Sequence, residues 1–298
     1  MQEQTFGPVR FLPGDNRGKY PFCHSVYIEG DRILIDPASN RKRLKQLKAE
    51  SGVTSIWLSH WHEDHFKHLD LFEKVPLYIS AADAPPLSSM DLFLDAYAVE
   101  DSQERSTWAS IMVNDFHFKP RTPAGFLEGG QTKLLNSVTV DIIAAPGHTP
   151  GHLCFFFREP RVLFLGDYDL TPFGPWYGDR MSSISQTIAS VRSLETLPAS
   201  VWLTCHETGV FTEPPGHLWT EYLNVIQTRE NKLLKLLETP KTLEDIVNAW
   251  IVYRKPREPL DFYMFSERAL MKKHLENLIS RSMIGTNGDN YWSWKEKI

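Results

Sequence analysis

One short segment, His60-Trp61-His62-Glu63-Asp64-His65, constrains this chain of 298 residues more than any other feature. It follows an apolar, β-branched run over residues 53–58, which predicts a buried strand. Because the chain turns where a strand ends, three imidazoles and a carboxylate can converge there on one point. Neutral imidazole suits zinc, iron, copper or nickel, and a nearby carboxylate fits a site with open positions. The segment therefore predicts a metal site at a strand end.

Three further segments of the same kind follow predicted strands. Gly147-His148 comes after a strand over 138–145, Gly166-Asp167 after one over 161–165, and Cys205-His206 after one over 201–204. Any one of these alone is more often a cap or a hydrogen-bonded side chain than a ligand. Four clusters at four strand ends, in order, are not explained in that way, so we predict that they form one site.

The remaining pattern contains both strands and helices. A hairpin is expected over 24–37, and residues 83–130 form an aromatic-rich helical insertion over one face of the core. From residue 239 a helix, a longer helix and a hairpin follow one another, which is typical of a winged-helix-like domain. The expected division is a catalytic domain over 1–238 and a winged-helix-like domain over 239–298. Further helices are predicted over 39–51, 182–197, 217–238, 242–250 and 266–282, and the last hairpin over 284–294.

Composition and charge exclude several classes of protein. Hydrophobic residues make up 42% and charged residues 23%, as in ordinary globular proteins. The longest apolar runs fall far short of the roughly 20 residues that span a bilayer, and the first residues lack a secretory signal. Three scattered cysteines (Cys23, Cys154 and Cys205) favour a reducing, cytoplasmic location without disulfides. The net charge of −5 makes a nucleic acid an unexpected partner, although a local basic patch stays possible.

The order of these motifs resembles the metallo-β-lactamase superfamily, over roughly residues 20–238. The resemblance rests on His-x-His-x-Asp-His, then Gly-His, Gly-Asp and a last His, and on the hairpin that ends in Leu34-Ile35-Asp36-Pro37. It implies an α+β fold, an αββα sandwich with a metal site along one edge. One metal would be held by His60, His62 and His148, the other by Asp64, His65 and His206, with Asp167 between them.

The same resemblance implies a metal-dependent hydrolase with two divalent ions, which we expect to be zinc, with iron or manganese as alternatives. A hydroxide bridging the two metals would attack a small ester, thioester or lactone, and the catalytic Asp64 would orient it. Asp167 stands where the antibiotic-degrading members usually carry cysteine, so β-lactams are not the expected substrate. The alternatives are a phosphodiesterase or ribonuclease of the winged-helix-tailed branch, and a mononuclear iron sulfur dioxygenase.

Other residues are expected to support the site rather than to form it. Asp36 is a candidate to fix an imidazole tautomer, although a strand-end cap is an equal alternative, and His152 is expected to be structural. Substrate choice should come from the 83–130 insertion and from the aromatic segment 168–180. The helix over 266–282 is expected either to close the site or to form a contact between two copies of the chain in a homodimer.

Overall fold

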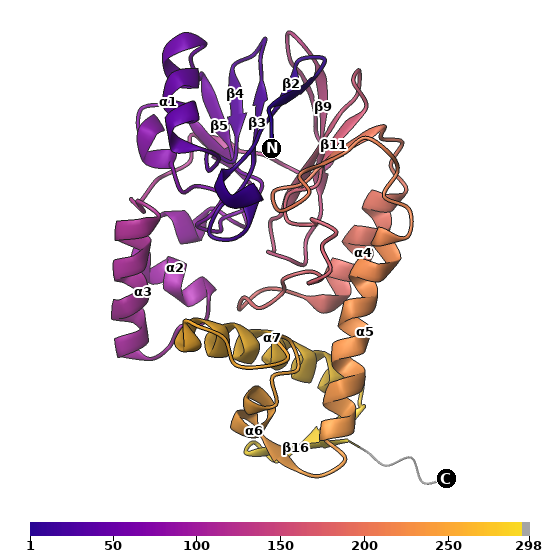
Figure 1. Ribbon diagram of the computed structural model, residues 1–298. Helices are drawn as coiled ribbons and strands as arrows, with labels where there is room; N and C mark the ends of the chain where they lie inside the picture. Colours follow the sequence, from indigo (N-terminus) through magenta and orange to yellow (C-terminus); the bar gives the residue numbers. More distant parts are fainter. Residues whose placement is uncertain (294–298) are drawn as a thin grey trace.

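Two mixed β-sheets packed face to face form the centre of the fold, seen in a computed structural model that describes residues 1–293 (Figure 1). The first sheet has the order β1-β2-β3-β4-β5-β6-β7, and the second has the order β13-β12-β11-β10-β9-β8. The first comprises β1 (Gln4–Phe6), β2 (Val9–Leu12), β3 (Ser25–Ile28), β4 (Ile33–Ile35), β5 (Ser55–Trp57), β6 (Leu77–Ile79) and β7 (Gly125–Phe126). The second comprises β8 (Thr132–Leu134), β9 (Thr139–Ala144), β10 (Leu153–Phe157), β11 (Val162–Phe164), β12 (Val201–Leu203) and β13 (Val210–Phe211).

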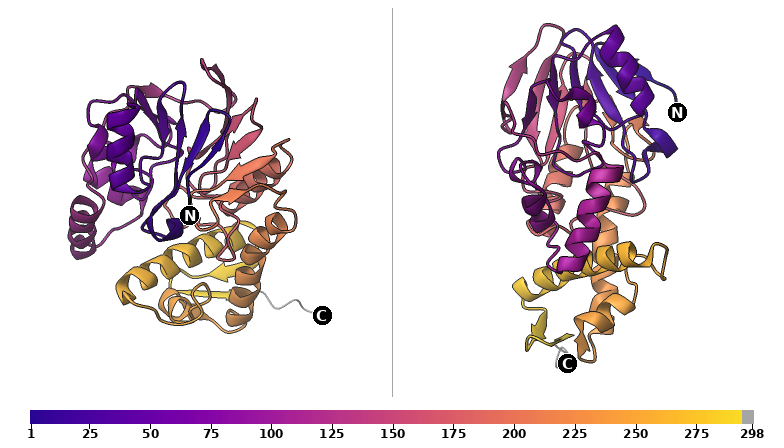
Figure 2. Two further views of the ribbon diagram at one scale, coloured as in Figure 1. Left: turned by 45° about the horizontal axis from the view of Figure 1, so that its top comes forward. Right: turned by 90° about the vertical axis from the view of Figure 1, so that its left-hand side faces the viewer.

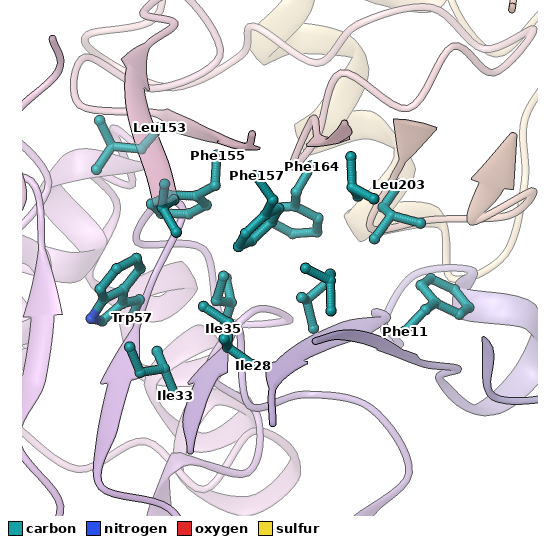
Figure 3. Packing of buried hydrophobic residues seen from close by; sticks show 14 of the residues in the cluster. Phe11, Ile28, Ile33, Ile35, Trp57, Leu153, Phe155, Phe157, Phe164 and Leu203 are labelled. Carbon is teal, nitrogen blue, oxygen red and sulfur yellow. The ribbon is translucent and has the colours of Figure 1, made fainter. Parts of the chain in front are cut away.

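The alternation of side chains along the strands explains why apolar runs build more than one core. Successive residues of a strand point to opposite faces of its sheet. In β4, Ile33 and Ile35 face the layer between the two sheets, whereas Leu34 packs on the outer face of the first sheet. In β11, Val162 and Phe164 lie in the central layer, and Leu163 packs on the outer face of the second sheet. Figure 3 shows the central layer, with side chains from both sheets meeting.

Helices cover both outer faces and complete the αββα arrangement. Helix α1 (Arg41–Glu50) packs Leu44 and Leu47 on the first sheet. Helices α4 (Ile184–Glu195) and α5 (Leu218–Leu236) cover the second sheet. Residues 83–130 contribute α2 (Met90–Ala96) and α3 (Ser102–Asp115), which lie beside the first sheet (Figure 2). Three short 3-10 helices lie at Asp15–Gly18, Leu69–Phe72 and Pro85–Leu87.

The C-terminal segment lies below the sandwich, at the bottom of Figure 1. It contains β14 (Lys241–Thr242), α6 (Leu243–Asn248), α7 (Leu260–Ser280), β15 (Ile284–Thr286) and β16 (Asn290–Ser293). The capping box of Thr242 and Asp245 at the start of α6 is confirmed. Helix α7 begins six residues before its predicted start, directly after Pro259. Residue 294, the last of the predicted hairpin, lies outside the described residues.

Contacts join α7 to the second sheet's side of the sandwich. His274 shares a hydrogen bond of 2.8 Å with the Tyr177 hydroxyl, and Lys273 Nζ donates to the Arg180 carbonyl at 2.7 Å. The boundary at residue 238 and the winged-helix character of the tail stay predictions. Among the described helices, none combines the length and the apolar character that crossing a membrane requires.

Candidate metal centre

Strand direction brings the four predicted clusters to one edge of the sandwich. Strands β9 and β11 both run antiparallel to β10, and β12 runs parallel to β11, so these three strands end at the same sheet edge. The loops that follow them carry His148, Asp167 and His206. In the first sheet, the segment after β5 carries the remaining four predicted ligands. The cluster therefore draws side chains from both sheets.

Three imidazoles and one carboxylate form the first group. His60 Nε2 lies 3.0 Å from His62 Nδ1 and 3.1 Å from His148 Nε2, and the last two nitrogens are 3.0 Å apart. Asp167 Oδ2 lies 3.3 Å from His148 Nε2 and 3.9 Å from His60 Nε2. All three imidazoles are buried. Four possible ligand atoms thus face one point.

The second group lies beside the first and shares Asp167 with it. Asp167 Oδ1 is 2.9 Å from His65 Nε2 and 3.2 Å from His206 Nε2. Asp64 completes the group, with Oδ2 3.5 Å from His206 Nε2 and Oδ1 3.8 Å from His65 Nε2. Each oxygen of Asp167 therefore faces a different group, and all seven predicted ligands lie together.

Hydrogen bonds on the outer side fix which nitrogen of each ring faces inward. Backbone carbonyls accept only, so His148 Nδ1 must donate to Trp176 O at 3.0 Å, and His206 Nδ1 must donate to Gly18 O at 2.6 Å. The proton on the outer nitrogen leaves a lone pair on the inner nitrogen of each neutral ring.

Carboxylates fix the other three rings. Asp179 accepts from His62 Nε2 at 2.8 Å, and Asp36 accepts from His65 Nδ1 at 3.0 Å. The Ser59 hydroxyl donates to Asp36, so it can only accept from His60 Nδ1. Asp36 thus fixes the tautomer of His65, one of the two roles that the sequence left open for it, and its side chain also accepts from Ser59 N at 2.8 Å.

The charge states of the rings reflect burial and their carboxylate neighbours. Burial lowers the pKa of His148 to about 4 and lowers the pKa of His60 well below its usual range. Burial also lowers the pKa of His62, but Asp179 more than offsets this and raises it to about 9. A proton on His62 Nδ1 would face two neutral nitrogens only 3.0 Å away. A divalent cation in that place would satisfy all three lone pairs.

The inward-facing atoms fit metal ions by a further observation. His65 Nε2 and Asp167 Oδ1 are buried, and neither has a protein hydrogen-bond donor as partner. Buried polar atoms without a partner are costly and call for an ion or a water. The donor set of imidazole nitrogens and carboxylate oxygens is the set that zinc, iron and manganese accept.

A pocket of about 770 Å³ opens over the cluster. Its floor includes His62, Asp64, His148, Asp167 and His206. Its walls come from the 83–130 insertion and the 168–180 segment, as predicted, and also from α5 and from residues 251–266. The first residues of α7, Phe262 to Ser266, line the pocket, whereas of the predicted helix over 266–282 only Ser266 does so, and both roles expected for that helix stay predictions. Aromatic rings of the wall include Tyr20, Tyr97, Trp108, Phe173, Tyr253 and Phe262.

Two functional groups were missed from the sequence. Asp179 orients His62 from a loop that appears in the sequence only as an aromatic segment. Glu63 lies inside the histidine motif, where its carboxylate accepts hydrogen bonds from Tyr20 at 2.8 Å and Tyr97 at 2.5 Å. Neither residue has a spacing that distinguishes it from a surface carboxylate. His152 accepts a hydrogen bond from Asp167 N at 3.2 Å, so it supports the loop that carries this predicted ligand.

Asp83 ties the start of the insertion to the loop of His148, and it predicts a pH effect on stability. Its carboxylate accepts from Thr149 Oγ1 at 2.5 Å and Gly151 N at 2.7 Å, yet burial raises its pKa to about 7. A raised pKa means that the native state prefers the protonated acid, so stability is lost as pH rises through this range. The charges of His62 and Asp179 act on the same carboxyl in opposite directions.

We therefore expect Asp83→Asn to change the pH profile of unfolding. The variant should become more stable relative to the wild type as the pH rises from about 4 to about 8. The difference between their free energies of unfolding should change by up to about 4 kcal/mol over this range. Denaturant titrations of both proteins across this range measure the difference. A difference that stays constant with pH would show that Asp83 does not titrate in this window.

An αββα sandwich with a buried histidine and aspartate cluster along one edge is the architecture of metal-dependent hydrolases. The model of the metallo-beta-lactamase superfamily matches residues 19–206, and the chain belongs to this superfamily. The resemblance and the fold class predicted from the sequence are thus confirmed. Metal binding is a property of this fold.

Comparisons with individual proteins extend the fold likeness to nearly the whole chain. A metallo-beta-lactamase family protein of Thermus thermophilus has a TM-score of 0.70 and 20% identity, covering 96% of this chain and 99% of that one. A beta-lactamase domain protein from Burkholderia ambifaria has a TM-score of 0.68 and 16% identity, covering 96% and 92%. These structures share the fold, including most of the C-terminal segment.

Curated relatives carry functional names at lower coverage. An atrochrysone carboxyl ACP thioesterase of Pseudocercospora fijiensis is 23% identical over 65% of this chain and 50% of its own length. A protein of the same name from Aspergillus fumigatus is 23% identical over 77% of this chain and 64% of its own length. The chain thus spans only half to somewhat under two thirds of these relatives.

Proposed function

We propose that this chain is a metal-dependent thioester hydrolase with two divalent ions, which we expect to be zinc. The observation that carries the proposal is Asp167, whose two oxygens face two separate groups of inward-pointing ligand atoms on the pocket floor. The curated relatives named as thioesterases support the choice of a thioester over an ester or a lactone. Hydrolysis breaks the carbon–sulfur bond, and water gives its hydroxyl to the acyl group and a proton to the thiolate.

The ligand assignment follows the two groups of side chains. One ion would be held by His60, His62 and His148, and the other by Asp64, His65 and His206, with Asp167 contacting both. Two such ions supply a Lewis acid for the carbonyl oxygen and lower the pKa of bound water toward neutrality.

The protein side chains position the reactants in this proposal. The Asp64 carboxylate lies on the pocket floor beside the second group, where its oxygens can accept a hydrogen bond from the attacking water and align it. Asp36 and Asp179 hold His65 and His62 in orientation. The aromatic walls exclude water and suit an apolar or aromatic acyl group.

Metal content and thioester turnover test the proposal together. Protein purified without added metal or chelator is expected to hold about two zinc ions per chain by elemental analysis. The metal-loaded protein should hydrolyse benzoyl-pantetheine. The free thiol that is released is measured by its reaction with a chromogenic disulfide.

Benzoyl esters and lactones of similar size serve as comparison substrates for this assay. Turnover of an oxygen ester but of no thioester would contradict the substrate class. One iron per chain and oxygen uptake with thiol persulfides would contradict hydrolysis altogether. A chain that holds no metal after reconstitution would contradict the site itself.

A further inference from the structure

The end of the pocket remote from the metal cluster is basic. Lys232 of α5 and Arg254 of the segment that leads into α7 line it there, and Arg257, three residues after Arg254, lines the same pocket. The carboxylates that line the same pocket come instead from the strand-end loops and their neighbours; they are Glu63, Asp64, Asp167, Asp169 and Glu207. Two further cations line the pocket elsewhere: Lys19 precedes Tyr20 in the chain, and Arg229 donates to the Tyr177 hydroxyl and to the Phe173 carbonyl. The carboxylates gather around the cluster, and Lys232 and Arg254 lie away from them.

Helix α5 runs from the metal cluster to the basic end of the pocket, so its rise per residue gives the distance between them. Near its start, the Tyr222 hydroxyl donates to the backbone carbonyl of Asp167 at 3.0 Å, which fixes this point beside the cluster. Lys232 lies ten residues further along the same helix. At a rise of about 1.5 Å per residue, the two positions are roughly 15 Å apart along the helix axis. Val225 and Thr228 line the pocket between them.

These cations have no carboxylate partner in the part of the chain that the structure describes. Within residues 1–293, no Asp or Glu oxygen lies within 4.0 Å of the side-chain nitrogens of Lys232, Arg254 or Arg257. Arg105 and Arg158, by contrast, are paired with aspartates at the surface. Arg257 instead lies over the rings of Tyr253 and Tyr263, 5.7 and 5.9 Å from their centroids. Unpaired guanidinium and ammonium groups at a pocket end suit a phosphate.

The positive end continues outward into a second hollow. This hollow, of about 520 Å³, shares Lys232, Ile251 and Arg254 with the first pocket and adds Lys235 to the basic set. Lys232, Lys235 and Arg254 are exposed there. A ligand anchored at this point can therefore extend away from the protein without leaving the positive field.

We propose that this basic cluster of Lys232, Arg254 and Arg257 binds the phosphate of a 4′-phosphopantetheine thioester. The inference rests on the proposed thioesterase function and specifies its substrate class. About thirteen bonds join the sulfur to the phosphorus of this arm, and an extended chain spans about 3.3–3.6 Å for every three bonds, so the arm reaches roughly 15 Å. With the thioester over Asp167, the phosphate reaches the level of Lys232.

The same arm occurs on coenzyme A and on acyl carrier proteins. Either source leaves the pocket at the phosphate, and the exposed second hollow leaves room for whatever lies beyond it. The shared chemistry is the phosphodiester or phosphate anion at the end of the arm. Separate assays with benzoyl-coenzyme A and with a benzoylated carrier protein distinguish the two sources.

The decisive comparison uses two substrates that differ only in the phosphate. Benzoyl-4′-phosphopantetheine is expected to have a KM about tenfold lower than benzoyl-pantetheine, with similar kcat. In the double variant Lys232→Ala/Arg254→Ala this ratio should fall toward one, because only the phosphorylated substrate loses these two contacts and Arg257 alone is left to bind its phosphate. Lys45→Ala, at an exposed lysine on α1 outside the pocket lining, is the matched control and should keep the tenfold ratio.

The outcomes separate this inference from the proposed function. If both substrates are hydrolysed with equal KM by the wild type, the thioesterase proposal stands and the phosphate site is wrong. If neither is hydrolysed by the metal-loaded protein, the thioesterase proposal fails, and calorimetric titration with coenzyme A decides on the site. Binding that is lost in the double variant and kept in Lys45→Ala supports the site, and equal binding by all three proteins overturns it.

Discussion

Replacing Asp167 with alanine is expected to abolish thioester hydrolysis and to lower the metal content of the chain. Its two oxygens lie 2.9 Å from His65 Nε2 and 3.3 Å from His148 Nε2, so the change removes an acceptor from both groups at once. If two ions share this ligand, as proposed, its loss should cost at least about 4 kcal/mol of transition-state stabilisation, or roughly 10³-fold in kcat/KM. Steady-state kinetics and elemental analysis of the same preparation measure both effects.

Asp91→Ala is the matched control for this variant. Asp91 lies on α2 with 89% of its side chain exposed, and it pairs with Arg105. It should keep full activity and the wild-type metal content. An Asp167→Ala protein that retains activity within about tenfold of the wild type would show that this carboxylate is not shared by two catalytic ions.

The largest loss of stability from adding a single methyl group is expected at Gly147→Ala. Gly147 has a φ of +131°, which L-residues rarely adopt, and a Cβ there would lie 2.2 Å from the Thr187 backbone nitrogen in the first turns of α4. Backbone cannot yield as a flexible side chain can, so either the loop or the helix must move. We expect a loss of more than about 3 kcal/mol in the free energy of unfolding. His148, the next residue, should be displaced with the loop.

Gly130→Ala separates backbone strain from overlap. Gly130 has a φ of +89°, but a Cβ there would meet no atom within 4 Å. This control should lose only about 1–2 kcal/mol of free energy of unfolding, from backbone strain alone. Denaturant unfolding of both variants gives the two values. Equal losses would show that close approach to Thr187 contributes nothing and that φ decides both.

The ligand cluster was predictable because two signals coincide there. Apolar runs such as 53–58 and 161–165 indicate strands, and a histidine or aspartate follows each run. The direction of the strands alone therefore brings these side chains to one edge of the sandwich. Asp179 has no such signal, because it lies in an irregular loop where no periodicity sets the orientation of a side chain. It is close to His62 only through the tertiary path of residues 168–180.

The tail shows a second limit of local patterns. The α6 cap was readable because Thr242 and Asp245 interact within one turn. The start of α7 was placed six residues late, since Pro256 and Pro259 indicate a break and the first turn is largely exposed. The first residues of α7 contact residues that are far away in the sequence: Phe262 stacks on Tyr20, with ring centroids 5.5 Å apart. That contact is long-range, and no local periodicity predicts it.

The origin of the ligand atoms in both sheets has a thermodynamic consequence. His60 and His62 follow a strand of the first sheet, whereas His148 follows a strand of the second and lies 3.0 Å from His62. An ion held by these rings is a cross-link between the two halves of the sandwich, and it closes a loop of more than eighty residues in the chain. Folding and metal affinity are then linked equilibria: every tenfold rise in free metal above the dissociation constant adds about 1.4 kcal/mol to the stability of the fold. Removal of the ion therefore weakens the association of the two sheets and also removes the chemistry at their edge.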